Sequence, residues 1–113
     1  METKDKEIIN FNIDFNDGTL RVSLVGDLGH QNVVDLREKV DTQIRELKPS
    51  CVVLDFSQVN FMDASGLGFI LGRAQLLGDL GGKLIIEKSN KSISRLISLA
   101  GIEKINNVKV NEN

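Results

Sequence analysis

The chain has 113 residues, of which 41% are hydrophobic, as expected for a single folded domain spanning residues 1–113 rather than a disordered chain. Its formal net charge of −2, with basic residues scattered among acidic ones, argues against nucleic-acid binding. No apolar stretch is long enough to cross a membrane, and no signal-like segment follows the mixed-charge N-terminus, so we expect a soluble cytoplasmic protein.

Cysteine and histidine each occur once, which limits the chemistry available to the chain. Cys51 alone cannot form an internal disulfide or a CxxC metal or redox motif, and its apolar neighbours predict a buried thiol. A zinc site would have to take its remaining ligands from carboxylates. We therefore expect neither a metal ion nor another cofactor.

The chain begins with the pattern of a β-hairpin. Residues 8–15 and 20–25 alternate between apolar and polar side chains, which is typical of half-buried strands. The turn sequence Asn16-Asp17-Gly18 separates them, and this combination predicts two antiparallel strands. Residues 26–30 are expected to form a loop.

A helix and a strand are predicted next. Asn32 is a candidate N-cap, and Lys48-Pro49-Ser50 ends the helical pattern. The apolar face of this helix is expected to consist of Val33, Leu36, Val40, Ile44 and Leu47. The apolar run at 51–54 predicts a strand covered on both faces, and residues 55–64 are expected to form a connection.

Two more helices and one or two strands complete the pattern. A helix begins at Ser65 or a neighbour and ends at Gly81-Gly82; Leu67, Ile70, Leu71, Ala74 and Leu77 form its apolar side. Residues 83–87 predict a short buried strand. Ser89 or Asn90 caps a third helix, which ends at Gly101 and has Ile93, Leu96, Ile97 and Ala100 inward. Residues 105–110 predict a weak strand or an extended tail.

The expected order is therefore β-β-α-β-α-β-α, followed by a short C-terminal strand or tail. Strands separated by helices need crossover connections, which make neighbouring strands parallel. We expect an α/β fold whose mixed, mostly parallel sheet opens with an antiparallel hairpin and carries the helices packed on it.

The glycine-rich segment Asp63-Ala64-Ser65-Gly66-Leu67-Gly68 is the candidate functional site. The position two before Ser65 is Asp63, where a hydrolase nucleophile elbow has glycine, and the single histidine, His30, lies upstream. The segment also lacks the lysine of a phosphate-binding loop and the third glycine of a dinucleotide fingerprint. No catalytic set can be assembled, so we expect a binding module and not an enzyme.

Ser65 itself has two interpretations. Serine is among the best N-cap residues, so its role could be structural. A helix start is also a good seat for an anion, so Ser65 could carry a phosphate of about −1.5 to −2 charges. Residue types alone leave both interpretations open. Phe61, Met62 and Leu67 would suit a buried protein contact beside it, and Asp63 could position the hydroxyl or a partner's cation.

Residues 55–73, DFSQVNFMDASGLGFILGR, resemble the signature segment of the STAS-domain anti-sigma factor antagonists, most closely the sporulation antagonist of the anti-sigma-F kinase. The similarity continues through residues 26–28, 81–83 and 93–102 and covers almost the whole chain. The resemblance implies the STAS fold, and the order of elements in that fold agrees with the order expected above.

The resemblance also implies a role in partner switching. In the family, the unphosphorylated antagonist binds an anti-sigma factor that is also a serine kinase, and so releases the sigma factor. The kinase then phosphorylates the antagonist, and a phosphoserine phosphatase reverses the modification. The phosphorylated serine falls on Ser65 and the nearby acid on Asp63. ATP is thus bound by the partner and not by this chain.

The resemblance places the partner-binding residues in two segments of the chain. They are Asp27, Gly29, His30, Met62, Asp63, Ala64, Ser65, Gly66, Leu67 and Gly68. Gly29 stands where the family commonly has aspartate, and Ala64 where the sporulation member has a second Ser or Thr. An alternative function is a STAS scaffold in a larger complex, stressosome-like or lipid-transporting, without phosphate control. Ser65 favours the switch and Gly29 favours the scaffold.

Overall fold

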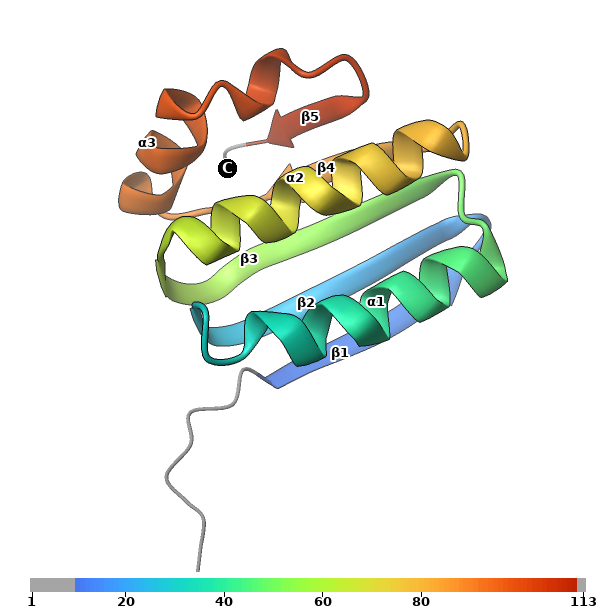
Figure 1. The fold of residues 1–113 in the computed structure, drawn as a ribbon, viewed down its shortest axis with the longest axis horizontal. Helices are drawn as coiled ribbons and strands as arrows, with labels where there is room; N and C mark the ends of the chain where they lie inside the picture. Colours follow the sequence, from blue (N-terminus) through green and yellow to red (C-terminus); the bar gives the residue numbers. More distant parts are fainter. Residues whose placement is uncertain (1–9, 112–113) are drawn as a thin grey trace, which may run out of the picture.

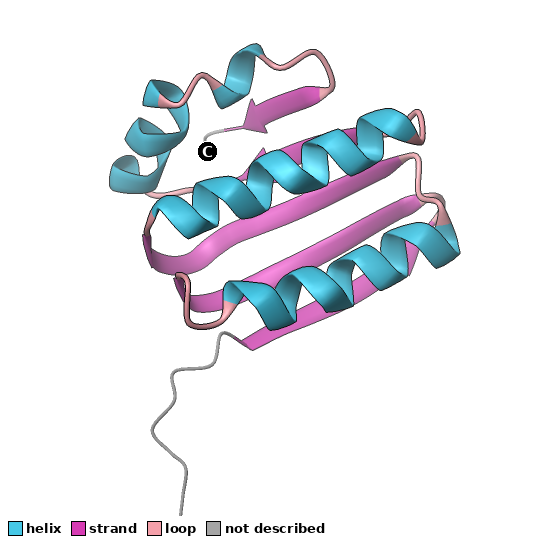
Figure 2. Cartoon of the chain, in the orientation of Figure 1, coloured by secondary structure: helices cyan, strands magenta, loops and turns pink. Residues whose placement is uncertain are grey.

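The computed structural model describes residues 10–111, which form five strands and three α-helices (Figures 1 and 2). In chain order they are β1 Asn10–Asn16, β2 Thr19–Leu28, α1 Val33–Leu47, β3 Cys51–Met62, α2 Ala64–Asp79, β4 Lys83–Glu87, α3 Lys91–Leu99 and β5 Val108–Asn111. A short 3-10 turn, η1, spans Ile102–Lys104. The predicted order is confirmed, and residues 105–110 do contain a strand. The predicted hairpin start at Ile8 and Ile9 lies outside the described residues.

The five strands form one mixed sheet in the order β1-β2-β3-β4-β5. Only the β1–β2 pair within it is antiparallel; each of the other pairs is parallel. Between β1 and β2, Asp17 and Gly18 have φ angles of 56° and 81°. Positive φ at both central residues is what a tight two-residue hairpin turn requires, so the predicted turn and the predicted mixed sheet are both confirmed.

Strands β2 and β3 run further than predicted. Residues 26–28, expected to be loop, belong to β2, and most of the expected connection at 55–64 belongs to β3. The two strands pair up to Leu28 and Met62, but their register shifts between Ser23 and Val25 and again between Gly26 and Asp27. Each shift places one extra residue in β3, which breaks the alternation of its side chains, so the sequence pattern does not reveal where β3 ends.

The helices α1 and α2 lie on the same face of the sheet (Figure 1). The reason is the strand order: each parallel strand is added on the same side of the last, so right-handed crossovers all fall on one face. The prediction that residues 51–54 are covered on both faces holds for Val53, which is 5% exposed on the face away from the helices, but not for the whole strand. Cys51 and Asp55 point to that same face and are partly exposed. Partial burial still raises the pKa of the Cys51 thiol.

A row of charges crosses the face opposite the helices. Arg21 Nη1 lies 3.2 Å from Glu87 Oε1 and 3.6 Å from Asp55 Oδ2. Partial burial alone would raise the pKa of Asp55, but hydrogen bonds from Ser57 and the positive charges of Lys88 and Arg21 outweigh it and lower that pKa. This row suits a solvent-facing surface, which agrees with helices packing on one side only.

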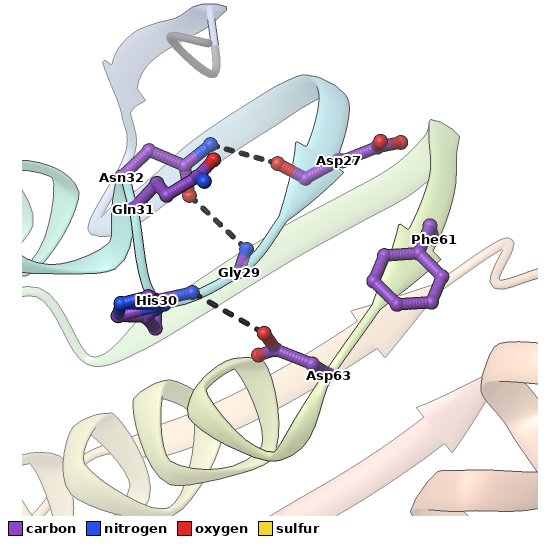
Figure 3. A pocket seen from close by; sticks show the side chains of 7 residues that line it. All are labelled: Asp27, Gly29, His30, Gln31, Asn32, Phe61 and Asp63. Atoms are coloured by element: carbon purple, nitrogen blue, oxygen red, sulfur yellow. Dashed lines mark hydrogen bonds between the residues drawn. The ribbon is translucent and has the colours of Figure 1, made fainter. Parts of the chain in front are cut away.

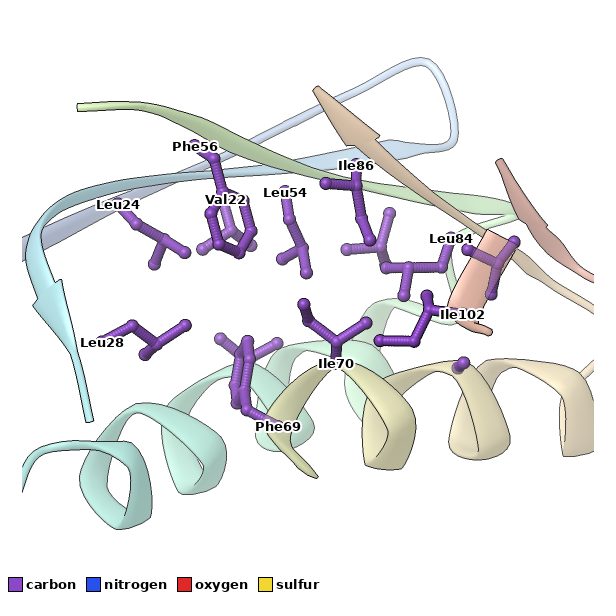
Figure 4. Packing of buried hydrophobic residues seen from close by; sticks show 14 of the residues in the cluster. Val22, Leu24, Leu28, Leu54, Phe56, Phe69, Ile70, Leu84, Ile86 and Ile102 are labelled. Carbon is purple, nitrogen blue, oxygen red and sulfur yellow. The ribbon is translucent and has the colours of Figure 1, made fainter. Parts of the chain in front are cut away.

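The core fills the space between the sheet and the helices (Figure 4). From α2, Phe69 and Ile70 point toward the strands, with exposed fractions of 2% and 0%. Leu71, predicted to be buried, is 42% exposed. One residue is a 100° step around a helix, so a face centred between Phe69 and Ile70 turns Leu71 to solvent. In α3, Ile93 and Ile97 are buried as predicted, but Ala100 is exposed.

Arg73 is a buried charged residue that joins α2 to α1. Its Nε lies 2.8 Å from Oδ1 of Asp41, and its Nη2 donates to Oδ2 of Asp41 at 3.3 Å. The guanidinium also lies over the ring of Phe69, 5.0 Å from its centroid. Burial lowers the pKa of Arg73, and the nearby carboxylate of Asp41 opposes that effect. The pair fixes the two helices that carry the site described next.

Candidate functional site

The ends of β2 and β3 bring the two predicted site segments together. Asp27 pairs with Phe61 and Leu28 pairs with Met62, so the turns that follow the two strands are neighbours. Figure 3 shows residues of both turns around one hollow. The predicted site residues thus come from two adjacent strand-to-helix turns. We call them corners: one leads from β2 into α1 and the other from β3 into α2.

Asp63 is the N-cap of α2. Its Oδ1 accepts a hydrogen bond of 2.8 Å from the backbone N–H of Ser65, and its carbonyl accepts from the N–H of Gly66 at 2.9 Å. Ser65 is the second residue of the helix and is partly exposed. The interpretation of Ser65 as the capping residue is therefore wrong. The carboxylate of Asp63 performs that role, and the hydroxyl of Ser65 is not needed for it.

Asp63 also bonds to the corner that leads into α1. Its Oδ2 accepts a long bond of 3.4 Å from the backbone N–H of His30, and its own N–H donates to the carbonyl of Leu28 at 3.2 Å (Figure 3). A Cβ atom at Gly29 would lie 3.1 Å from Oδ2 of Asp63. A larger residue at position 29 would therefore press on this carboxylate.

Asn32 precedes α1 but does not cap it with its side chain. The amide turns back into the preceding turn instead: Oδ1 accepts from the N–H of Gly29 at 3.1 Å, and Nδ2 donates to the carbonyl of Asp27 at 2.9 Å. The side chain is 9% exposed. Asn32 thus occupies the predicted N-cap position of α1, but its side chain closes the turn at residues 27–32 and makes no capping bond to the helix.

A polar hollow lies between the two corners. It is lined by Asp27, Gly29, His30, Gln31, Asn32, Phe61 and Asp63 (Figure 3). Two of these, Asp27 and Asp63, bring carboxylates, and Phe61 is 55% exposed. We call this the acidic hollow. Gln31 and Asn32 were not predicted to be part of the site, because their place follows from the hydrogen bonds of the turn and not from any sequence pattern.

Met62 and Gly66 are buried residues that pack beneath the surface of the site. The side chain of Met62 is 2% exposed and lies in the core, so the prediction that it meets a partner at the surface is wrong. Gly66 is buried against it: a Cβ atom there would clash with Cγ of Met62 and lie 3.1 Å from the carbonyl oxygen of Leu28. Only glycine allows this close approach of α2 to the two strand ends.

The surface beside the acidic hollow is formed by the first turns of α2. Ala64 and Gly68 are exposed, and Ser65 and Leu67 are partly exposed. Within residues 10–111, no group of three or more His, Cys, Asp or Glu side chains is placed to hold a metal ion. No helix in the same range is both long enough and apolar enough to span a membrane. The site is thus an exposed surface beside a polar hollow.

Comparison with known proteins identifies the class. The STAS domain family matches residues 10–113, so the fold is that of a STAS domain. The chain is 33% identical over 104 residues to the anti-sigma F factor antagonist of Paenibacillus polymyxa, which covers 92% of this chain and 89% of that protein. The chain belongs to the STAS-domain anti-sigma factor antagonists, which are regulatory proteins and not catalysts.

Solved structures agree with this assignment. The unphosphorylated form of the anti-sigma factor antagonist SpoIIAA is 26% identical with a TM-score of 0.70, over 80% of this chain and 83% of that one. The phosphorylated form of the Bacillus SpoIIAA is 24% identical with a TM-score of 0.72, over 89% and 90%. A Thermotoga maritima protein at 20% identity has a TM-score of 0.81, over 91% and 86%. The last two comparisons bear on the fold alone.

Proposed function

We propose that this chain is an anti-sigma factor antagonist gated by phosphorylation of Ser65. Unphosphorylated, it binds an anti-sigma factor serine kinase in the cytoplasm, and the sigma factor is released. The observation that carries the proposal is that Asp63 and Ser65 have different roles at the start of α2. Because Asp63 caps the helix, the hydroxyl of Ser65, a partly exposed residue, is not required for capping and is available for modification. That the structure of SpoIIAA at 26% identity is described as its unphosphorylated form supports the same mechanism here.

A phosphate at Ser65 would change the surface more than the fold. It would add about −1.5 to −2 charges at a helix start, where the helix dipole favours an anion. The carboxylates of Asp27 and Asp63 lie in the hollow beside this turn. A partner that fits the unmodified surface would therefore meet added bulk and negative charge, and the complex would dissociate.

The partner surface that we propose combines both corners. Asp27, Gly29 and His30 contribute from the turn before α1, and the exposed or partly exposed residues of α2 contribute the rest. In this proposal ATP is bound by the kinase, and a phosphoserine phosphatase restores the unmodified protein.

The direct test is mass spectrometry of the protein after incubation with ATP and the anti-sigma kinase of its own organism. We expect one added phosphate at Ser65, none on Ser65→Ala, and normal modification of the control Ser57→Ala, whose serine is exposed on β3. Ser65→Ala should bind the kinase and stay bound, whereas Ser65→Asp should bind weakly. Equal binding by the two Ser65 variants would contradict the switch.

The alternative is a STAS scaffold that binds partners without phosphate control. Gly29 favours it, because the resemblance to the family leads one to expect an aspartate there. Gly29 also has a structural role, because the absence of a side chain there leaves room for the carboxylate of Asp63. Binding to the kinase without phosphate transfer would favour the scaffold.

A further inference from the structure

A second hollow lies on α3 and differs in charge from the acidic hollow. It is lined by Ser89, Lys91, Ser94, Arg95 and Ser98. Its lining offers two cations and three hydroxyl groups and contains no carboxylate. We call it the basic hollow.

The basic hollow lies at the same edge of the sheet as Ser65. Strands β3 and β4 are parallel neighbours, so α2 and α3, which follow them, begin at the same edge (Figure 1). The N-cap of α3, Asn90, ties the two together. Its Nδ2 donates to the carbonyls of Val59 at 3.4 Å and Asn60 at 3.3 Å, near the end of β3. The start of α3 is therefore fixed to the strand that leads to Ser65.

The arrangement of α3 turns these cations outward. Ile93 and Ile97, each 1% exposed, anchor the other side of the helix in the core. Lys91 and Arg95 are four residues apart, so they lie on one side of the helix, and both are exposed. The ion pairs found within residues 10–111 involve Arg21, Lys39 and Arg73, and none includes either of these two cations. Both can therefore reach a binding partner.

The serine hydroxyls are ordered beside the cations. The Oγ atoms of Ser89 and Ser94 lie 2.6 Å apart in a hydrogen bond, and Oγ of Ser94 is also 3.3 Å from the carbonyl of Ser89. The loop before α3 is thus held against its first turns. The hydroxyl of Ser98 donates to Oε2 of Glu103 at 3.3 Å. Lys91 and Arg95 are therefore the groups of this hollow that suit a partner's carboxylate oxygens, which accept hydrogen bonds from both.

We propose that the basic hollow is a second docking area, and that it receives an acidic surface of the anti-sigma factor. This rests on the proposed function, because it extends the surface around Ser65. The edge of the sheet then carries Asp27 and Asp63 on one side and Lys91 and Arg95 on the other. A partner with the opposite arrangement of charges would be held in one orientation and would associate faster. The exposure of both cations suits a protein surface better than a small anion.

The test is the association rate of the kinase with the Lys91→Glu, Arg95→Glu double variant. The matched control is Arg45→Glu with Lys109→Glu, two exposed cations outside the basic hollow and the same change in charge. We expect the first variant to associate about ten-fold more slowly at low salt, with a smaller difference at high salt. The control should change less than about two-fold, as expected for charges outside the interface. Circular dichroism would verify that both variants fold.

The outcomes separate this proposal from the proposed function. If Ser65→Asp weakens binding but both double variants associate equally, the switch stands and the second docking area is refuted. If Ser65→Asp binds normally, the proposed function fails instead. Saturable binding of inorganic phosphate at the basic hollow, with unchanged kinase association in the variant, would also overturn the proposal, because it would indicate a site for a small anion.

Discussion

The two corners of the site use the side chain at the helix N-cap position differently. Each joins a strand to a helix, and each carries a capping-type residue at the position just before the helix. At the start of α2, Asp63 caps its own helix with Oδ1. At the start of α1, Asn32 leaves its helix uncapped by its side chain and closes the turn behind it. The residue type at a cap position therefore does not establish which backbone group the side chain will bind.

The difference follows from the shape of each corner. The corner at α2 is a direct step from strand to helix, with one residue between Met62 and Ala64. The corner at α1 has four residues between Leu28 and Val33, and a turn of that length has its own N–H and carbonyl groups to satisfy. Asn32 has both a donor and an acceptor, so it can bind one of each. Asp63 then links the two corners through His30.

The largest effect is expected from Gly66→Ala, which attacks the support shared by both corners. The new methyl group would meet Met62 and the carbonyl of Leu28, so we expect a loss of about 1–3 kcal/mol in the free energy of unfolding. Urea denaturation would measure it. The control is Gly68→Ala on the same helix, where the added atom meets nothing within 4 Å and should stabilise the protein by up to about 1 kcal/mol. Equal effects of the two changes would contradict the packing described for Gly66.

Asn32→Ala should break the turn before α1 alone. It removes two hydrogen bonds and leaves the N–H of Gly29 and the carbonyl of Asp27 without these partners, at a cost of about 1–2 kcal/mol. Asn32→Asp keeps the acceptor but loses the donor, so its loss should be smaller. Hydrogen exchange of the Gly29 amide would localise the change; if protection were lost in the first turn of α1 instead, the comparison would fail.

Asp63→Ala should loosen the start of α2 by about 1 kcal/mol, a typical value for a lost N-cap. Asp63→Asn keeps a side-chain oxygen and should lose less. Faster amide exchange of Ser65 in the alanine variant is the local measurement. If Ser65→Ala destabilised the protein as much as Asp63→Ala, the assignment of the cap to Asp63 would be wrong.

The smallest effect is expected from Gly29→Ala, which tests the link between the corners. Its methyl group would press on Oδ2 of Asp63, and the long bond to His30 should be lost, with a change of stability within about 0.5 kcal/mol. Combining it with Asp63→Ala removes the crowding, so the two changes should not be additive. A strictly additive double variant would show that the corners are independent.

The sequence predicts this fold well where local patterns report on local structure. The Asp17-Gly18 turn is an example: the residues that can adopt positive φ stand where the hairpin needs them. The predictions fail where the register of paired strands decides the outcome. The end of β3 has no regular alternation, because its pairing with β2 shifts register there. In β2 the alternation of burial continues to Leu28, but Gly26 and Asp27 look like loop residues in the sequence.

The site could be predicted only in outline. The segment around Ser65 is recognisable from its residues, and so is the turn near Asp27. Three features of the site depend on three-dimensional contacts. Asp63 caps α2, the side chain of Asn32 bonds to the turn that precedes α1, and Met62 lies in the core. The basic hollow combines residues of a loop and a helix with an unremarkable sequence, so only the fold reveals that they share the edge of the sheet that carries Ser65.

Because β2 to β5 all run in the same direction, the edge opposite Ser65 consists of the turns where these strands begin. Ser50 joins three of those turns: its N–H donates to the carbonyl of Gly18, and its carbonyl accepts from the N–H of Lys83. That edge is remote from both hollows. A fluorophore or surface tether attached there, for example through cysteine in place of the exposed Asp79, would leave the docking surfaces free for single-molecule measurements.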